Sequence, residues 1–171
     1  MIQEVCKNIK FVGCDDPELR LFEGQYVTPE GMCYNSYVIL DDQIAIMDTI
    51  DPRCQEEWAA KLEKALDGRQ PDYLVVHHME PDHAGSIARL LNTYPNVKVV
   101  CSAMAQPMLK QFNEDLDLTD RVQAVKEGDT LSLGHCTLQF IAAPSVHWPE
   151  VMMSYVPEEQ VLFSADGFGK F

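Results

Sequence analysis

The residues best suited to chemistry lie close together near the middle of the chain. Four side chains that can bind a metal ion, His78, Glu80, Asp82 and His83, fall within six positions. An apolar run over 73–76 precedes them, and a buried strand with such an ending presents it at the edge of a sheet, where ligand sites tend to lie. Imidazole and carboxylate form a mixed nitrogen and oxygen set, which favours iron, manganese or zinc over a metal that prefers thiolate.

The spacing within this cluster predicts two metal ions rather than one. In an extended loop the side chains of His78, Glu80 and Asp82 alternate and project to one side, so His83 is free to point toward a second ion. His77 lies one position off the alternation. We therefore expect it to face away from the metals, in packing or as a hydrogen-bond partner behind a ligand. A lone histidine at a strand end is more often a surface or hydrogen-bonded residue, but four ligand types in six positions are much less common.

Two later segments carry further candidate ligands. His147 follows an apolar strand predicted over 136–142, and Asp166 follows another predicted over 160–164. Taken singly, His147 would be read as a buried histidine with satisfied hydrogen bonds, and Asp166 as a turn-forming aspartate before glycine. If the three strands end at one edge of the sheets, these side chains converge on the first cluster. We therefore predict that both are ligands.

The composition is that of a soluble globular domain. The chain has 171 residues, of which 46% are hydrophobic and 23% charged, and this length fits one domain. A net charge of −14 argues against nucleic acid or an anionic membrane as a partner, because both attract basic surfaces. The sequence has no apolar stretch of membrane-spanning length and no signal peptide. Six scattered cysteines without a Cys-x-x-Cys motif indicate reduced thiols, so we predict a cytoplasmic location.

Strand patterns at both ends of the chain enclose a region of alternating strands and helices. Apolar stripes predict helices over 58–66 and 87–94, and a further helix after Ser102. Alternating or continuous apolar runs predict strands over 9–12, 25–28, 36–40, 43–48, 73–76, 97–101, 131–133, 136–142, 151–156 and 160–164. This order predicts an α+β fold, with a mixed sheet or two packed sheets and the helices outside, rather than a doubly wound fold.

The combined motifs resemble the metallo-β-lactamase superfamily. Its pattern is His-x-His-x-Asp-His, followed by a His, an Asp and a final His at successive strand ends. Here Glu80 stands at the position of the second His of the hydrolases. That replacement, the His-Trp-Pro sequence at 147–149 and the segment 164–169 resemble the flavodiiron proteins (A-type flavoproteins), as do segments 34–37 and 47–49. The match covers essentially the whole chain.

The resemblance implies a non-haem diiron site. The first iron would take His78, Glu80 and His147, the second would take Asp82 and His83, and Asp166 would bridge the two. Members of the family differ in whether the residue at His83 binds directly or is displaced by water. An anionic, harder ligand such as Glu80 stabilises iron that cycles between its ferrous and ferric states better than a neutral imidazole does.

The implied fold is a metallo-β-lactamase-like αββα sandwich, of which residues 1–171 would be the N-terminal half to two-thirds. The family pattern needs one more His on a later strand and a C-terminal flavodoxin-like domain that holds FMN. Neither has a counterpart in this chain, which also lacks a phosphate-cradling loop. Unpaired strand edges would make such a half-sandwich unstable or sticky. We therefore expect a piece of a larger protein, or one chain of a complementing pair.

The implied activity is that of an oxidoreductase that reduces O₂ to water, NO to N₂O, or both, and this chain would be inactive without the remainder. Electrons would come from FMN on a neighbouring subunit of a homodimer or larger assembly, and a rubredoxin-like small redox protein would feed the flavin. Trp148 and Tyr34 are candidate pocket walls. The alternatives are a dinuclear zinc hydrolase of the metallo-β-lactamase superfamily, against which Glu80 argues, and a non-catalytic fragment.

Overall fold

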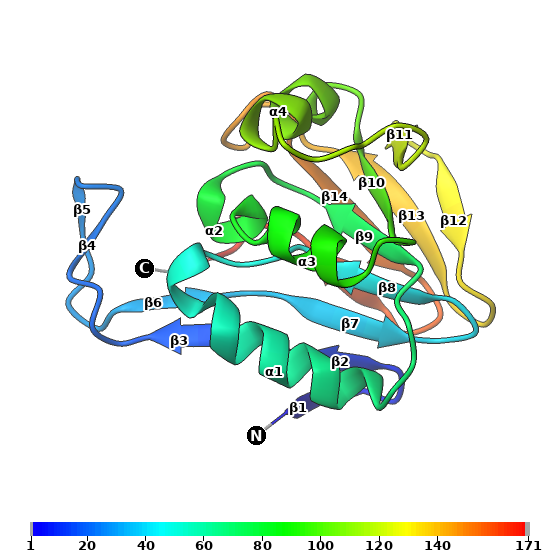
Figure 1. Ribbon diagram of the computed structural model, residues 1–171, viewed down its shortest axis with the longest axis horizontal. Coiled ribbons are helices and arrows are strands. Elements are labelled where there is room, and N and C mark those ends of the chain that lie inside the picture. Colours follow the sequence, from blue (N-terminus) through cyan, green and yellow to red (C-terminus); the bar gives the residue numbers. More distant parts are fainter. Residues whose placement is uncertain (1, 170–171) are drawn as a thin grey trace.

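The computed structural model describes residues 2–169 and is built around a mixed sheet of seven strands (Figure 1). Its order is β1-β2-β7-β8-β9-β10-β11. The strands are β1 (Gln3–Cys6), β2 (Ile9–Phe11), β7 (Tyr37–Leu40), β8 (Ile44–Met47), β9 (Tyr73–Val76), β10 (Lys98–Ser102) and β11 (Val122–Val125). The pairs β1–β2, β2–β7 and β7–β8 are antiparallel. Strands β8 to β11 run parallel, so the carboxyl ends of these four meet at one edge.

A second, antiparallel sheet packs against the first. It consists, in order, of β12 (Thr130–Ser132), β13 (Thr137–Ala142), β14 (Met152–Val156) and β15 (Val161–Phe163). Two short pairs lie apart from both sheets: β3 (Cys14–Asp16) with β6 (Met32–Tyr34), and β4 (Leu21–Phe22) with β5 (Tyr26–Val27). The helices are the 3₁₀ turn η1 (Pro52–Cys54), α1 (Gln55–Leu66), α2 (Pro81–Ala84), α3 (Ile87–Thr93) and α4 (Ala105–Phe112).

The central strands are buried on both faces, which explains their continuous apolar sequences. In β9, Leu74 and Val76 belong to the core under the helices, whereas Val75 points into the core between the two sheets. Helices α1 and α3 cover one face of the seven-stranded sheet, and β13 and β14 lie behind the other (Figure 1). The described residues thus form one helix layer and two sheet layers.

Most of the predicted elements are confirmed. The strand over 73–76 has the predicted bounds, and the two packed sheets with outer helices agree with the α+β prediction. The helix predicted after Ser102 is α4, and it includes Pro107 as its third residue, where the backbone N–H would lack an intrahelical partner in any case. The short strands β1, β3, β4, β6 and β11 were not predicted, since each is only two to four residues long.

The two sheets are tied together at the ends of their hairpins by Asp41. This buried carboxylate, in the turn between β7 and β8, accepts backbone N–H groups of His135 at 3.2 Å and Cys136 at 2.6 Å, and the His135 ring at 2.9 Å. The N–H of Gln43 also donates to the carbonyl of Leu133 at 2.8 Å. The relative position of the sheets, and hence of any residues at their edges, depends on this contact.

We expect Asp41→Asn to lower the free energy of unfolding by about 2 kcal/mol near pH 5, because an amide cannot replace all the bonds that the carboxylate accepts. Burial opposes ionisation, but the hydrogen bonds from Cys136 and His135 hold the pKa of Asp41 well below its usual range. Its contribution is therefore complete above the unfolded-state pKa of about 3.9 and is lost as the pH falls below it.

Urea unfolding of both proteins at several pH values measures this difference. The gap should be full near pH 5 and shrink below about pH 4. Asp42→Asn, at the exposed neighbouring position, is the matched control and should change little. A gap of the same size at pH 3 would show that the Asp41 charge does not stabilise the contact.

Candidate metal centre

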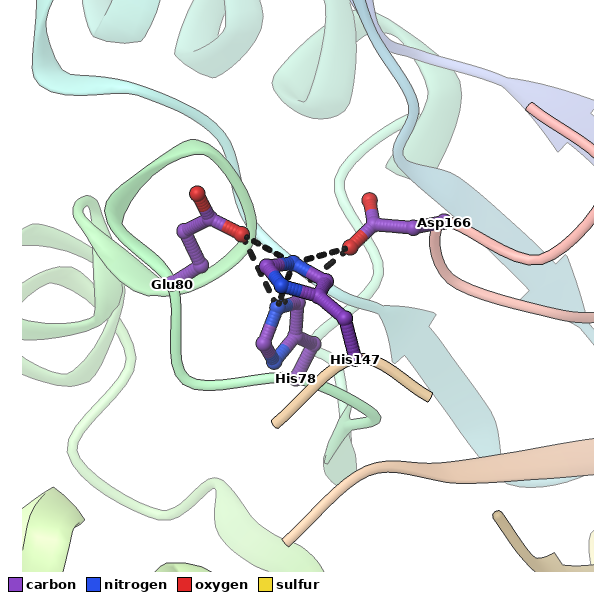
Figure 2. Close-up of side chains that lie close together, drawn as sticks. All are labelled: His78, Glu80, His147 and Asp166. Atoms are coloured by element: carbon purple, nitrogen blue, oxygen red, sulfur yellow. Dashed lines mark hydrogen bonds and ion pairs between the residues drawn. The ribbon is translucent and has the colours of Figure 1, made fainter. Parts of the chain in front are cut away.

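Three connections meet at one edge of the two sheets. The first follows β9 and runs through residues 77–80 into α2. The second is the β13–β14 connection, residues 143–151, and the third follows β15. Figure 2 shows the side chains of His78, Glu80, His147 and Asp166 converging from these connections on a common point. The prediction that three strands end at a shared edge is therefore confirmed, although His147 lies within the connection rather than directly after the strand.

The four converging side chains approach one another through single atoms. His78 Nε2 lies 3.0 Å from Glu80 Oε2, 3.3 Å from His147 Nε2 and 3.3 Å from Asp166 Oδ2. His147 Nε2 lies 2.9 Å from the same Glu80 oxygen and 3.2 Å from Asp166 Oδ2. Atoms about 3 Å apart around one centre have the spacing of four tetrahedral ligands that each lie about 2 Å from an ion.

The hydrogen bonding of this group also fits a cation. The Nδ1 atom of His78 contacts a carboxylate oxygen of Glu150 at 2.8 Å, and a carboxylate can only accept, so Nδ1 donates. In the neutral ring Nε2 then carries a lone pair, which faces the Glu80 oxygen and the second imidazole. Two or more lone pairs that point at one another require a positive charge between them, from a proton or from a metal ion.

A second group adjoins the first and shares Asp166 with it. Asp82, His83 and Asp166 bring one ligand atom each within 4.8 Å of one another. His83 Nε2 lies 2.7 Å from Asp166 Oδ1 and 3.6 Å from Asp82 Oδ2. Because Asp166 faces the first group with Oδ2 and the second with Oδ1, its carboxylate has the position of a bridge. Among the described residues, the buried Asp82 Oδ1 has no hydrogen-bond partner, as expected of a ligand atom.

The pKa values of side chains in the two groups are shifted in directions that favour cation binding. Burial raises the pKa of Asp82 to about 6, and the nearby carboxylates of Glu80 and Asp166 add to the rise. Burial also opposes ionisation of Glu80, but hydrogen bonds from His78, Glu23 and His147 lower its pKa to about 2. The pKa of His83 is well above its usual value, since the carboxylates around it outweigh its burial. Added positive charge stabilises this cluster.

One part of the predicted geometry is wrong. The alternation of His78, Glu80 and Asp82 was expected to place all three on one side of an extended loop. Instead the backbone turns helical after Glu80, because Pro81 begins the one-turn helix α2. Asp82 is rotated away from the first group and joins His83 in the second. The division of the six side chains between two groups nevertheless matches the one implied by the family resemblance.

A cavity of about 380 Å³ opens onto both groups. Besides the ligand side chains, its lining includes Phe22, Glu23, Tyr26, Met32, Cys33 and Asn35. The prediction that Tyr34 forms a wall of this cavity is wrong, because its ring is buried in the core under the helices. The ring of Trp148 meets the His78 ring edge-on at 5.1 Å and supports that ligand without lining the cavity.

Comparison with known proteins places the chain in a family. Residues 32–171 match the sequence model of the ODP family beta lactamase. The chain belongs to this family. Its fold is the metallo-β-lactamase-like fold of the N-terminal part of flavodiiron proteins: it matches the flavodiiron protein of Giardia intestinalis with a TM-score of 0.91 and 34% identity, over 99% of this chain and 41% of that one. Rubredoxin oxygen:oxidoreductase of Desulfovibrio gigas gives a TM-score of 0.89 and 31% identity, over 95% and 40%.

Two curated relatives of this ODP-family chain carry names that state an activity. The nitric oxide reductase of Moorella thermoacetica is 40% identical over 97% of this chain and 41% of its own length. The anaerobic nitric oxide reductase flavorubredoxin of Pectobacterium atrosepticum is 37% identical over 99% of this chain and 33% of its own length. The chain thus spans between a third and about two-fifths of these relatives. Within residues 2–169, no helix has the length and apolar character that crossing a membrane requires.

The residue that supports His78 from behind in this ODP-family chain was not predicted from the sequence. Glu150 is buried. Its carboxylate accepts a hydrogen bond from His78 Nδ1 at 2.8 Å and another from the Met79 N–H at 3.0 Å. A carboxylate behind a histidine ligand fixes the tautomer and the orientation of the ring. The only signal for it was an acidic residue in an otherwise apolar segment, between Pro149 and Val151.

We expect Glu150→Ala to weaken metal binding by about 10- to 100-fold, because the His78 ring would lose the contact that orients its Nε2 atom. Anaerobic titration of the metal-free protein with Fe²⁺ or Co²⁺ measures the affinity. Glu150→Gln, which keeps an oxygen acceptor, should recover most of the loss. Glu158→Gln, at an exposed position away from the centre, is the control. Equal affinities in all four proteins would contradict this role of Glu150.

Proposed function

We propose that this chain is the metal-binding part of a flavodiiron oxidoreductase, with two non-haem irons held by His78, Glu80, Asp82, His83, His147 and Asp166. The observation that carries the proposal is the pair of ligand groups that share the Asp166 carboxylate. The reaction would be O₂ + 4 H⁺ + 4 e⁻ → 2 H₂O, or 2 NO + 2 H⁺ + 2 e⁻ → N₂O + H₂O. The names of the relatives, which include nitric oxide reductases and an oxygen oxidoreductase, support both versions.

The residues of the chain have separable roles in this proposal. The six ligand residues would hold two irons, which would supply electrons for the reduction of a small molecule. The carboxylates of Glu80, Asp82 and Asp166 offset the charge of the metals, and Asp166 holds the two positions together. The cavity of about 380 Å³ has room for two molecules of the size of NO, since a water molecule occupies about 30 Å³ in the liquid. Glu23 and Asn35 give its wall polar groups.

We further propose that residues 1–171 form part of the metallo-β-lactamase-like domain and that a flavodoxin-like domain elsewhere in the same protein holds FMN. In a head-to-tail homodimer or larger assembly, that FMN would come from the neighbouring subunit. A rubredoxin-like protein or domain would deliver electrons to it. The names of the relatives support this partner, and the chain covers only 33–41% of the length of the two curated relatives above.

Metal content is the direct test. Protein purified anaerobically from its native source should contain about two irons per chain. The intact mass is measured on the same sample. We expect Asp166→Ala to lose most of both ions, because both groups use this carboxylate. Asp115→Asn, at an exposed position, should keep them. Two zinc ions and hydrolysis of an ester or amide would instead support the hydrolase, and absence of metal from the wild type would overturn the proposal.

The position of Glu80 provides a second test. We expect Glu80→His to shift the metal content from iron toward zinc and to lower the rate of O₂ or NO reduction, because imidazole is a neutral and softer ligand than carboxylate. Elemental analysis after growth with equal iron and zinc measures the shift, and Glu80→Asp, which keeps the carboxylate, is the matched variant. Unchanged iron content in Glu80→His would show that this residue does not select the metal.

A further inference from the structure

His77, which is not a ligand, connects the two sheets directly behind the metal centre. Its Nδ1 atom lies 2.8 Å from Asp48 Oδ2, at the end of β8, and its Nε2 atom lies 2.7 Å from Ser154 Oγ on β14. Its backbone N–H donates to Asp48 Oδ1 at 2.7 Å, and its carbonyl accepts the Met152 N–H at 3.0 Å. The expectation that His77 faces away from the metals as a hydrogen-bond partner is confirmed.

The order Ser154–His77–Asp48 is that of a hydrolase triad, but these side chains cannot act as one. Ser154 has no exposed surface and His77 has 1%. The His77 ring also stacks on Phe163, with ring centres 6.3 Å apart. No substrate reaches a hydroxyl in this position, so a nucleophilic role is excluded, and a role must be sought in what these side chains hold in place.

Asp48 faces one of the candidate ligands. Its Oδ2 atom lies 3.8 Å from His83 Nδ1, which has no hydrogen-bond partner among the described residues. The next residue, Thr49, holds the backbone of His83, because its N–H and its hydroxyl both donate to the His83 carbonyl at 2.8 Å. Residues 48 and 49 therefore contact His83 at its backbone and at its ring.

We propose that His77, through Asp48, is a positioning residue that directs His83 Nε2 toward the second metal ion. This inference rests on the proposed function, since it concerns the second group of ligands. His77 fixes both oxygens of Asp48, one through its backbone and one through its ring, and Ser154 fixes the far side of that ring. Loss of the His77 ring would remove the hydrogen bond to Asp48 Oδ2, the oxygen that faces His83, and leave Asp48 held by the backbone N–H at Oδ1 alone.

The carboxylate behind His83 matters because a histidine ligand needs its proton on the nitrogen that faces away from the metal. A negative charge near Nδ1 favours the ring form with the proton there and leaves the lone pair on Nε2. Glu150 does the same for His78 in the first group. Each buried histidine ligand thus has a buried carboxylate behind it, and His77 holds the one that serves the second ion.

A role in packing alone predicts a different result from a positioning role. If His77 only stabilised the junction of the two sheets, its loss would weaken the binding of both ions by similar factors. If His77 positions His83, its loss would weaken the second ion selectively. The ratio of the two affinities therefore distinguishes the roles, whatever the effect of a variant on overall stability.

The experiment is an anaerobic Co²⁺ titration of the metal-free full-length protein, followed by absorption and calorimetry. In His77→Leu we expect the affinity for the second ion to fall by about 10- to 100-fold, with that for the first changed by less than about threefold. His77→Asn should recover most of the loss, because its side-chain N–H can donate to Asp48 in place of Nδ1–H. Ser154→Ala should weaken the second ion by about threefold, the effect of one hydrogen bond.

Two controls make the result interpretable. His147→Ala removes a ligand from the first group only and so identifies which binding step belongs to which ion. Leu62→Ala removes a buried side chain of α1 in the core under the helices, and should lower stability without changing the ratio of the affinities. Equal losses for both ions, or no loss, in His77→Leu and Ser154→Ala would overturn the positioning role. A wild type that binds no Co²⁺ would instead overturn the proposed function.

Discussion

The central physical constraint on this structure is the withdrawal of several carboxylates from water into one small volume. Glu80 and Asp82 are buried beside Asp166, and like charges at such distances repel strongly when water cannot screen them. Imidazoles lie between them, and two of these, His78 and His147, present their Nε2 atoms to the same point. Such an arrangement is stable only with positive charge at its centre, and the surrounding sheets and connections serve to hold it together.

The two sheets contribute different parts of the centre, so their relative position matters as much as their internal order. His78 and the helix α2 follow the parallel strand β9, whereas His147 and Asp166 come from connections of the antiparallel sheet. The contact of Asp41 with the β12–β13 turn fixes the sheets at one end, and the hydrogen bonds of His77 with Asp48 and Ser154 fix them beside the metal ligands. Both contacts use polar groups, which demand a defined geometry where apolar packing alone would tolerate sliding.

The convergence of the candidate ligands could be predicted from the sequence better than the residues that support them, and the reason is physical. A ligand at the end of an apolar strand is visible in local spacing, so His78 and Asp166 could be recognised together with the strands that precede them. Glu150 supports a histidine that lies 72 positions earlier, and Ser154 contacts one that lies 77 positions earlier. Neither pairing leaves a periodic pattern. The helix α2 was missed because Pro81 permits either an extended path or a helix start, and only the packing of residues 82–84 decides between them.

The character of the centre follows from the ligand at position 80 and from the carboxylates behind the histidines. Within the metallo-β-lactamase-like fold, the resemblance places a histidine at position 80 in hydrolases, and here a carboxylate stands there instead. Glu80 adds one negative charge to the first group, and Glu150 and Asp48 add two more behind the rings. More negative charge around a metal favours its higher oxidation state, which an oxidoreductase must visit and a zinc hydrolase need not. Under the proposed function, Glu80, Glu150 and Asp48 would therefore adapt the metallo-β-lactamase-like fold to redox chemistry.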